Sequence, residues 1–230
     1  MRNTATVPLP TLRQQLAGRE DPILRAIAHR RRLPFDGGLY AENGLRFGMS
    51  RFEFKLYGRE LRRALAGDYT RGERPLGKLW LPRVKRSLPN LTQDIRQAYV
   101  SFLREICPPG DDPKTYDAAF VRDLDALWFL SERIHEAGTS VGRTKLENAD
   151  ADADTLAAYE DAIGRKDVPG LMALLRDKEQ EDAVTVRVRS KAIASKLDPD
   201  VAEYLFRTLV FPLTLKAEAL DLILASSGGT

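Results

Sequence analysis

The chain has 230 residues, of which 43% are hydrophobic and 30% are charged. This length is enough to bury a core, as one large domain or two small ones, and the composition is that of an ordinary soluble protein. No apolar run approaches the roughly 20 residues that span a bilayer, and the first residues lack the apolar core of a secretory signal. We therefore expect a cytoplasmic protein without a membrane segment.

Residue types that bind metals through nitrogen or sulfur are scarce. Cys107 is the only cysteine, and His29 and His135 are the only histidines. A lone cysteine excludes an intramolecular disulfide and a cysteine-based zinc site, and two histidines argue against a histidine-rich metal site. We expect neither a metal nor a cofactor.

The net charge is +3 and the pI is about 9.0. Basic residues gather at 30–32, 62–63 and 83–86, in short runs that are typical of a solvated surface. The mild excess of positive charge fits an anionic small molecule, whereas no RNA-binding motif or zinc-finger spacing accompanies the runs. Nucleic acid is therefore not expected as a partner.

Amphipathic helices are predicted along the first half of the chain. The first spans about 12–32, with a kink or break at Pro22. A second is predicted over 51–66 and a third over about 91–106, with a long connection at 67–90. The buried face of the first helix is expected to carry Leu12, Leu16, Ile23, Leu24 and Ile27.

The longest helix is predicted over about 117–146, where Leu127, Ile134 and Val141 recur every seven residues, as in the seam of packed helices. Alternating valines at 185–190 are interpreted as helix rather than strand. Three more helices are predicted, over 155–163, 167–194 and 199–224, the last with a kink at Pro212. The expected fold class is all-α, a single-domain bundle of long packed helices.

No nucleophile motif, phosphate-binding loop or metal-ligand spacing occurs in the sequence. What remains is a set of polar side chains on apolar helices, where a charge is costly unless it is paired or used. Two pairs of these side chains have i, i+4 spacing: Asp177 with Glu181, and Thr214 with Glu218. Three cations lie elsewhere in the sequence: Arg13, Arg133 and Lys145. The spacing alone equally fits solvated carboxylates and salt-bridged arginines.

Four segments resemble, in order, the all-helical chorismate mutases of the eukaryotic type. LRQQLAGREDPIL at 12–24 is similar to the opening helix of that family, and RDLDALWFLSERIH at 122–135 to its long helix. KDVPGLM at 166–172 resembles its turn into the next long helix, and VFPLTLKAE at 210–218 resembles its closing helix. Residues 36–115 match poorly.

The resemblance implies one domain over 1–230 that rearranges chorismate to prephenate. Such an enzyme would serve the shikimate pathway, in aromatic amino acid or specialised-metabolite biosynthesis. Residues 1–10 are expected to be flexible. The resemblance also implies a homodimer, with the contact in 36–115. Apolar side chains in this region are Leu39, Phe47, Phe52, Phe54 and Leu56.

Carried over position by position, the resemblance implies an active site of seven residues. Two arginines would grip the substrate's carboxylates, a lysine and a protonated glutamate would meet its ether oxygen, and a carboxylate pair would face its ring hydroxyl. In that order these residues are Arg13 and Arg133, Lys145 and Glu218, and Asp177 and Glu181, and Thr214 completes the set. A pericyclic rearrangement needs shaping and charge stabilisation rather than a nucleophile, so such a site fits the reaction.

One spacing differs from the family. Its arginine and lysine are eleven residues apart, whereas Arg133 and Lys145 are twelve apart. One extra residue rotates a side chain by about 100° on a helix, so a bulge or an unwound turn is expected between them. Alternatively, Thr144 takes the place of the lysine, and Lys145 or Arg143 reaches round to bind the substrate.

Two other functions stay open. One is an enzyme of the same fold on a related substrate, for example an isochorismate pyruvate lyase. The other is a non-catalytic helical module that binds a protein or RNA through the arginines at 30–32 and 62–63. Regulated fungal members bind aromatic amino acids with an Arg-Arg pair and a Gly-Ser turn. Arg62 and Arg63 supply the pair, but Asp117 and Ala118 replace the turn, so this regulation is not expected.

Overall fold

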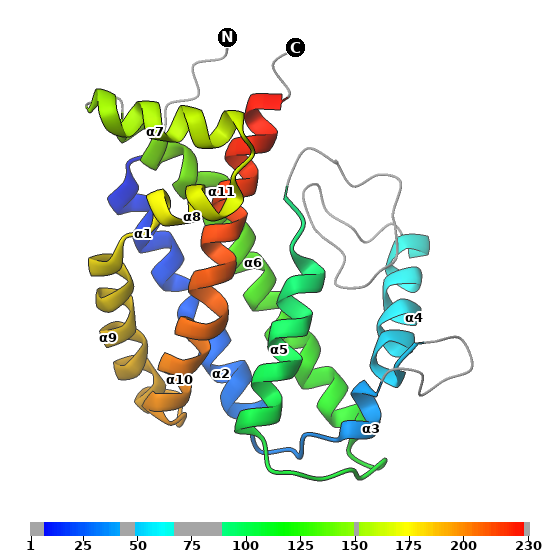
Figure 1. Cartoon of the computed structure of the whole chain (residues 1–230). Coiled ribbons are helices and arrows are strands. Elements are labelled where there is room, and N and C mark those ends of the chain that lie inside the picture. The colour runs from blue at the N-terminus through cyan, green and yellow to red at the C-terminus, as the bar shows by residue number, and fades with distance from the viewer. Residues whose placement is uncertain (1–6, 42–48, 67–88, 150–151, 228–230) are drawn as a thin grey trace.

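The computed structural model of the chain describes residues 7–41, 49–66, 89–149 and 152–227. Helices are the only regular elements in these ranges, so the predicted all-α class is confirmed for them (Figure 1). None of the helices described is long and apolar enough to cross a membrane.

Helix α6 (Tyr116–Ala149) is the axis of the fold and is about 51 Å long at 1.5 Å per residue. Helix α11 (Phe211–Ser227) packs along its C-terminal half, and α1 and α2 pack on it as well (Figure 1). The predicted seam of α6 is confirmed, because its apolar residues are all buried; they are Leu124, Leu127, Leu130, Ile134 and Val141.

The first predicted helix is divided in two, α1 (Leu9–Gly18) and α2 (Glu20–Arg30). The expected break is therefore present, but at Arg19 rather than at Pro22, which lies in the first turn of α2, where a missing N–H breaks no helical hydrogen bond. Arg19 donates to Glu132 and Glu136 of α6, at 2.8 and 2.9 Å. These contacts fix the joint between α1 and α2 on α6.

Helix α4 (Arg51–Ala66) has the predicted bounds, and α5 (Thr92–Ile106) begins one residue later than predicted. Between α2 and α4 lies the short α3 (Gly37–Tyr40). Most of the predicted connection at 67–90 lies outside the described residues.

The apolar residues around α3 and α4 divide between core and surface. Leu39, Phe52 and Leu56 are buried in the chain's own core, whereas Phe54 is 55% exposed. Phe47 lies outside the described residues. Only part of this segment is thus free to contact a second copy of the chain.

The prediction of one helix over 167–194 is wrong. The structure has α8 (Val168–Leu175) and α9 (Lys178–Ala194), with Arg176 extended between them. Asp177 is the N-cap of α9 and accepts a hydrogen bond from the Gln180 N–H at 3.0 Å. A carboxylate that caps a new helix competes with continuation of the old one, which explains the break. Asp177 and Glu181 therefore do not share a face within one helix.

The last predicted helix, 199–224, is an uninterrupted helical run of changing type. It comprises α10 (Pro199–Leu205), a π-helical turn (Phe206–Val210) and α11. The π turn ends at Val210, two residues before Pro212, which has no N–H for the i−4 bond of an α-helix. The proline thus coincides with a change of helix type. Upstream, α7 (Ala153–Gly164) covers the C-terminal end of α6.

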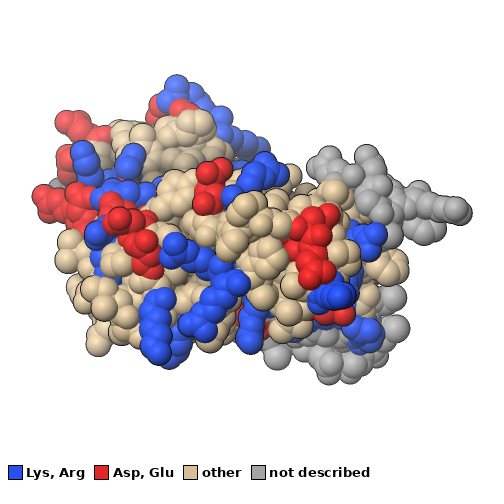
Figure 2. Space-filling view, turned by 90° about the horizontal axis from the view of Figure 1, so that it is seen from below, with Lys and Arg blue, Asp and Glu red and all other residues tan. Residues whose placement is uncertain are grey.

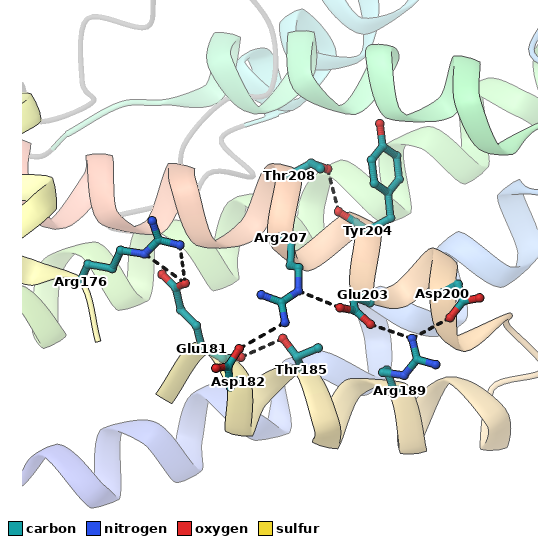
Figure 3. A network of polar contacts seen from close by, with 10 residues as sticks. All are labelled: Arg176, Glu181, Asp182, Thr185, Arg189, Asp200, Glu203, Tyr204, Arg207 and Thr208. Carbon is teal, nitrogen blue, oxygen red and sulfur yellow. Dashed lines mark hydrogen bonds and ion pairs between the residues drawn. The ribbon is translucent and has the colours of Figure 1, made fainter. Parts of the chain in front are cut away.

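Ion pairs join α9 to the run that follows it (Figure 3). Arg189 on α9 donates to Asp200 and Glu203 of α10, both at 2.7 Å. Arg207 in the π turn donates to Glu203 at 2.8 Å and to Asp182 at 3.2 Å. Exposed pairs contribute little individually, but this network fixes how α9 lies against α10.

The interpretation of 30–32 as a solvated arginine run is wrong for Arg30, which is fully buried. Its guanidinium donates to Asp123 of α6 at 2.7 Å, so its charge is paired inside the core. Figure 2 shows Lys and Arg side chains beside Asp and Glu side chains over one face of the molecule. That mixed pattern does not favour a nucleic-acid surface there.

Candidate active site

A single pocket collects the seven site residues that the resemblance implies, whereas the eighth candidate, Arg143, is not among its lining residues. It lies between α1, α6, α9 and α11 and encloses about 610 Å³, counting space open to solvent. The seven that line it are Arg13, Arg133, Lys145, Asp177, Glu181, Thr214 and Glu218. Segments 164 residues apart thus meet at one place, as the hydrogen bond from Arg13 to Asp177 shows.

The bulge expected between Arg133 and Lys145 is absent, because α6 is α-helical throughout this part. Both residues nevertheless line the pocket, together with Ala137 and Val141. These four follow one another at i, i+4 spacing, and such a row is inclined by about 26° to the helix axis. The pocket follows this row rather than the axis, so the extra residue does not turn Lys145 away.

Lys145 itself, rather than Thr144 or Arg143, reaches the pocket. Thr144 donates to the Ser140 carbonyl of its own helix at 3.1 Å. Arg143 donates to Asp221 at 2.6 and 3.0 Å and is not among the residues that line the pocket. Its prediction as a substrate-binding residue is thus not supported by its position, since an ion pair with α11 holds it elsewhere.

Lys145 and Glu218 form a buried ion pair. The ammonium donates to a Glu218 carboxylate oxygen at 2.9 Å and to the Leu175 carbonyl, at the end of α8, at 2.7 Å. Glu218 is 2% exposed, and burial raises its pKa above the usual range although Lys145 and Arg133 oppose the shift. The site thus holds a fixed cation beside a carboxyl group that is unusually easy to protonate.

Arg133 is buried with part of its hydrogen-bonding capacity unused. Within the described part of the chain, its Nε and Nη1 atoms have no hydrogen-bond partner, and neither has the Thr214 hydroxyl. Burial lowers the pKa of Arg133 despite the nearby carboxylates of Glu20 and Glu218. A buried guanidinium with unused N–H donors beside a pocket is suited to bind an anion, because most of its desolvation has already taken place.

Arg13 and Asp177 close one side of the pocket. Arg13 donates to one Asp177 oxygen at 2.6 Å, and the other oxygen caps α9. Each side chain keeps about a third of its surface exposed. An anion that enters the pocket therefore competes with Asp177 for Arg13.

Glu181 is held from outside the pocket. Arg176, in the joint between α8 and α9, donates to one Glu181 oxygen from both Nε and Nη2, at 3.2 and 2.9 Å (Figure 3). The same oxygen receives both bonds, so the second oxygen is not engaged by Arg176. Glu181 keeps hydrogen-bond acceptor capacity next to the pocket.

Sequence reasoning missed Gln180 and Arg187, which also line the pocket. Together with Val184 they follow an i, i+4, i+7 pattern on α9, which predicts a common face. That pattern would have identified them. Arg187 makes a bidentate pair with the fully buried Glu20, with contacts from 2.6 to 3.2 Å.

Four cations and three carboxylates line the pocket, and its walls are otherwise mostly apolar. In the described ranges, no group of three or more His, Cys, Asp or Glu side chains is placed to hold a metal ion. The arrangement suits a small organic dianion that also carries a hydroxyl group, because it offers separate cations and separate carboxylates in one desolvated space.

Comparison with known proteins agrees with this geometry, although no protein-family model matches the chain. Chorismate mutase 2, cytosolic, from Zea mays is 27% identical over 243 aligned positions, which cover 91% of this chain and 92% of that protein. The crystal structure of the chloroplast chorismate mutase from Zea mays is 25% identical with a TM-score of 0.73, over 94% of this chain and 95% of that one.

The chorismate mutase Aro7p from Candida albicans, solved in complex with L-Trp, has the same fold. Its TM-score is 0.78 at 23% identity, over 97% of this chain and 93% of that one. The fold is all-helical in the described ranges, and its pocket brings four cations and three carboxylates together. The chain is a homologue of the plant and fungal chorismate mutases and shares their fold.

Proposed function

We propose that this pocket is the active site of a chorismate mutase, an isomerase that rearranges chorismate to prephenate. The observation that carries the proposal is the buried Arg133 guanidinium, two of whose nitrogens lack a partner in the described ranges, inside a pocket that also holds Arg13 and Lys145. The homology to chorismate mutases over most of the chain supports it.

Two carboxylates of chorismate require two cations. Arg133 offers unused N–H donors, and Arg13 offers a second guanidinium once its bond to Asp177 loosens. Paired arginines would hold the substrate in the compact conformer in which the two reacting carbons meet. Fixing that conformer removes much of the entropic barrier to the reaction.

The rearrangement breaks the ether carbon–oxygen bond while a carbon–carbon bond forms, and no atom leaves the molecule. Negative charge grows on the ether oxygen as the bond stretches. Lys145 and a protonated Glu218, 2.9 Å apart, would both donate to that oxygen. They stabilise the transition state more than the ground state, which is what raises the rate.

The ring hydroxyl of the substrate needs a hydrogen-bond acceptor. Glu181 has one oxygen that Arg176 does not engage, and Asp177 lies one turn before it, at the N-cap of the same helix, and also lines the pocket. We assign the hydroxyl to these carboxylates, as the resemblance to the chorismate mutases implies.

A direct ultraviolet assay of chorismate consumption tests the proposal. The product is then converted with acid, because prephenate gives phenylpyruvate. Formation of phenylpyruvate in stoichiometric amount supports the mutase. Release of pyruvate from isochorismate without mutase activity would assign the alternative lyase reaction, and no turnover of either substrate would assign a binding module.

A homodimer is part of the proposal, with the exposed side of α4 as the contact. Phe54 and Tyr57 lie on this helix and are 55% and 40% exposed, so a second copy of the chain could cover them. We expect light scattering at micromolar concentration to give twice 25.8 kDa. A mass of one chain would contradict the dimer. A cytoplasmic location is supported by the name of the maize relative, which is cytosolic.

A further inference from the structure

Helices α6 and α11 lie side by side and touch at backbone level (Figure 1). A Cβ atom added at Gly138 would lie 2.4 Å from the Ala217 Cβ, which is inside any van der Waals contact. A Cβ added at Gly142 would lie 3.1 Å from the Glu218 Cβ, and 3.3 Å from both its Cα and its carbonyl oxygen. At both positions the absence of a side chain on α6 sets how close α11 can come.

Gly142 lies one turn before Lys145, the residue that pairs with Glu218. Gly142 belongs to the i, i+4 row of α6 next to the row that lines the pocket, which consists of Arg133, Ala137, Val141 and Lys145. The surface of α6 that packs against α11 therefore adjoins the surface that lines the pocket. Lys145 cannot simply follow a displaced Glu218, because its ammonium is also bound to the Leu175 carbonyl at 2.7 Å. The position of α11 therefore determines the distance between the two groups.

We infer that Gly142 is a positioning residue for the reaction: the bare α6 backbone there lets α11 place the Glu218 carboxyl against Lys145. This inference rests on the proposed function for its kinetic consequence, but its geometric content does not. A methyl group at 142 must push the Glu218 backbone away by a few tenths of an ångström, while both side chains remain present.

Several charged and titratable groups face Glu218 and set its protonation. Lys145 and Arg133 approach from α6, Arg13 from α1 and Tyr159 from α7, and α9 contributes Glu181 and Arg187 to the same pocket. Lys145 has the largest opposing effect on the pKa of Glu218. Moving the carboxyl away from this ammonium raises the pKa of Glu218 further.

The test compares Gly142→Ala with wild type and with Gly164→Ala. Gly164 is the last residue of α7, and a Cβ there meets nothing within 4 Å among the described residues, so this control makes the same chemical change in a helix without the contact. We expect kcat of Gly142→Ala to fall about tenfold with KM changed little, because small misplacements of reacting groups are costly. The descending limb of its pH–rate profile should move to higher pH, whereas Gly164→Ala should match wild type.

A second readout needs no substrate. The carboxyl carbon of Glu218, assigned in carbon-13 spectra by its loss in Glu218→Gln, should titrate at higher pH in Gly142→Ala than in wild type. An unchanged titration and unchanged kinetics in folded Gly142→Ala would overturn the inference. If wild type itself does not consume chorismate, the proposed function fails, and the titration still decides the role of Gly142.

If Gly142→Ala does not fold, Glu218→Asp decides instead. This variant keeps the contact at the Cβ and retracts the carboxyl group by one methylene. A loss of kcat of about tenfold or more supports the need for exact placement. Wild-type kcat in Glu218→Asp would show that placement to within one bond length is unimportant, and the inference would be overturned.

Discussion

Arg30 of α2 and Arg133 of α6 are both buried, at 0% and 6% exposure, but their surroundings differ. The Arg30 guanidinium donates to Asp123, to the Leu33 and Pro34 carbonyls and to the Tyr40 hydroxyl, at 2.7 to 3.1 Å. In the described ranges, Arg133 has two nitrogens without any partner. Arg30 thus binds Asp123 near the N-terminal end of α6, whereas Arg133 lies near the middle of that helix.

The pKa directions follow this contrast. Burial alone would lower the pKa of Arg30, but Asp123 and Tyr40 outweigh it and the pKa is raised. Burial lowers the pKa of Arg133, and the carboxylates of Glu20 and Glu218 do not compensate. A buried charge whose partners are complete is costly to disturb, because removing it leaves its partner uncompensated, whereas one whose partners are missing is suited to bind a ligand that supplies them.

The largest effect is expected from Arg30→Ala, which leaves the buried Asp123 carboxylate without its cation. Removing one partner of a buried ion pair costs about 3–5 kcal/mol of unfolding free energy. Denaturant unfolding of Arg30→Ala and of the exposed control Arg32→Ala measures this, and the control should stay within about 0.5 kcal/mol of wild type. Equal stability of Arg30→Ala and wild type would contradict the structural role of this cluster.

Arg133→Ala should show the reverse pattern. We expect kcat/KM for chorismate to fall by at least about 10²-fold, because a carboxylate clamp in a desolvated site is lost. The unfolding free energy should change by less than about 1 kcal/mol, since the lost side chain has few bonds to replace. Circular dichroism and denaturant unfolding control for structure. Near wild-type turnover would remove Arg133 from the site.

Helix positions could largely be predicted from the sequence, because apolar periodicity alone determines which face is buried. The seam of α6 and the bounds of α4 illustrate this. The break before α9 could not be predicted in the same way. Asp177 has the polarity of an exposed helical residue, and only its hydrogen bond to the Gln180 N–H distinguishes a cap from a continuation.

The site residues were predicted by resemblance rather than by periodicity, and the structure brings seven of the eight to one pocket. Two errors came from treating helices in isolation. The first error was to expect that one extra residue between Arg133 and Lys145 would turn Lys145 away from the pocket. The pocket runs along an i, i+4 row, which is inclined to the helix axis, so both residues line it. The run at 30–32 looked solvated because its buried partner, Asp123, lies 93 residues away from Arg30.

The smallest effect, and the sharpest test of the site, concerns pH. A carboxylic acid at Glu218 stabilises the ether oxygen only while it is protonated, because a carboxylate there would repel the developing charge. Burial raises the pKa of Glu218, and Lys145 opposes this shift without cancelling it. Glu218 is protonated below this raised pKa, so activity should be highest at acid pH and should fall as pH rises through it.

Glu218→Gln separates this role from a structural one. Its amide still donates a hydrogen bond and does not ionise, so we expect the variant to be somewhat slower than wild type at acid pH and to keep a level rate into the alkaline range. The two profiles should therefore cross or converge as pH rises, because only wild type loses its donor. If Glu218 merely paired with Lys145, the variant would be slower by a constant factor at every pH, and two profiles of identical shape would exclude the protonated carboxyl from the reaction.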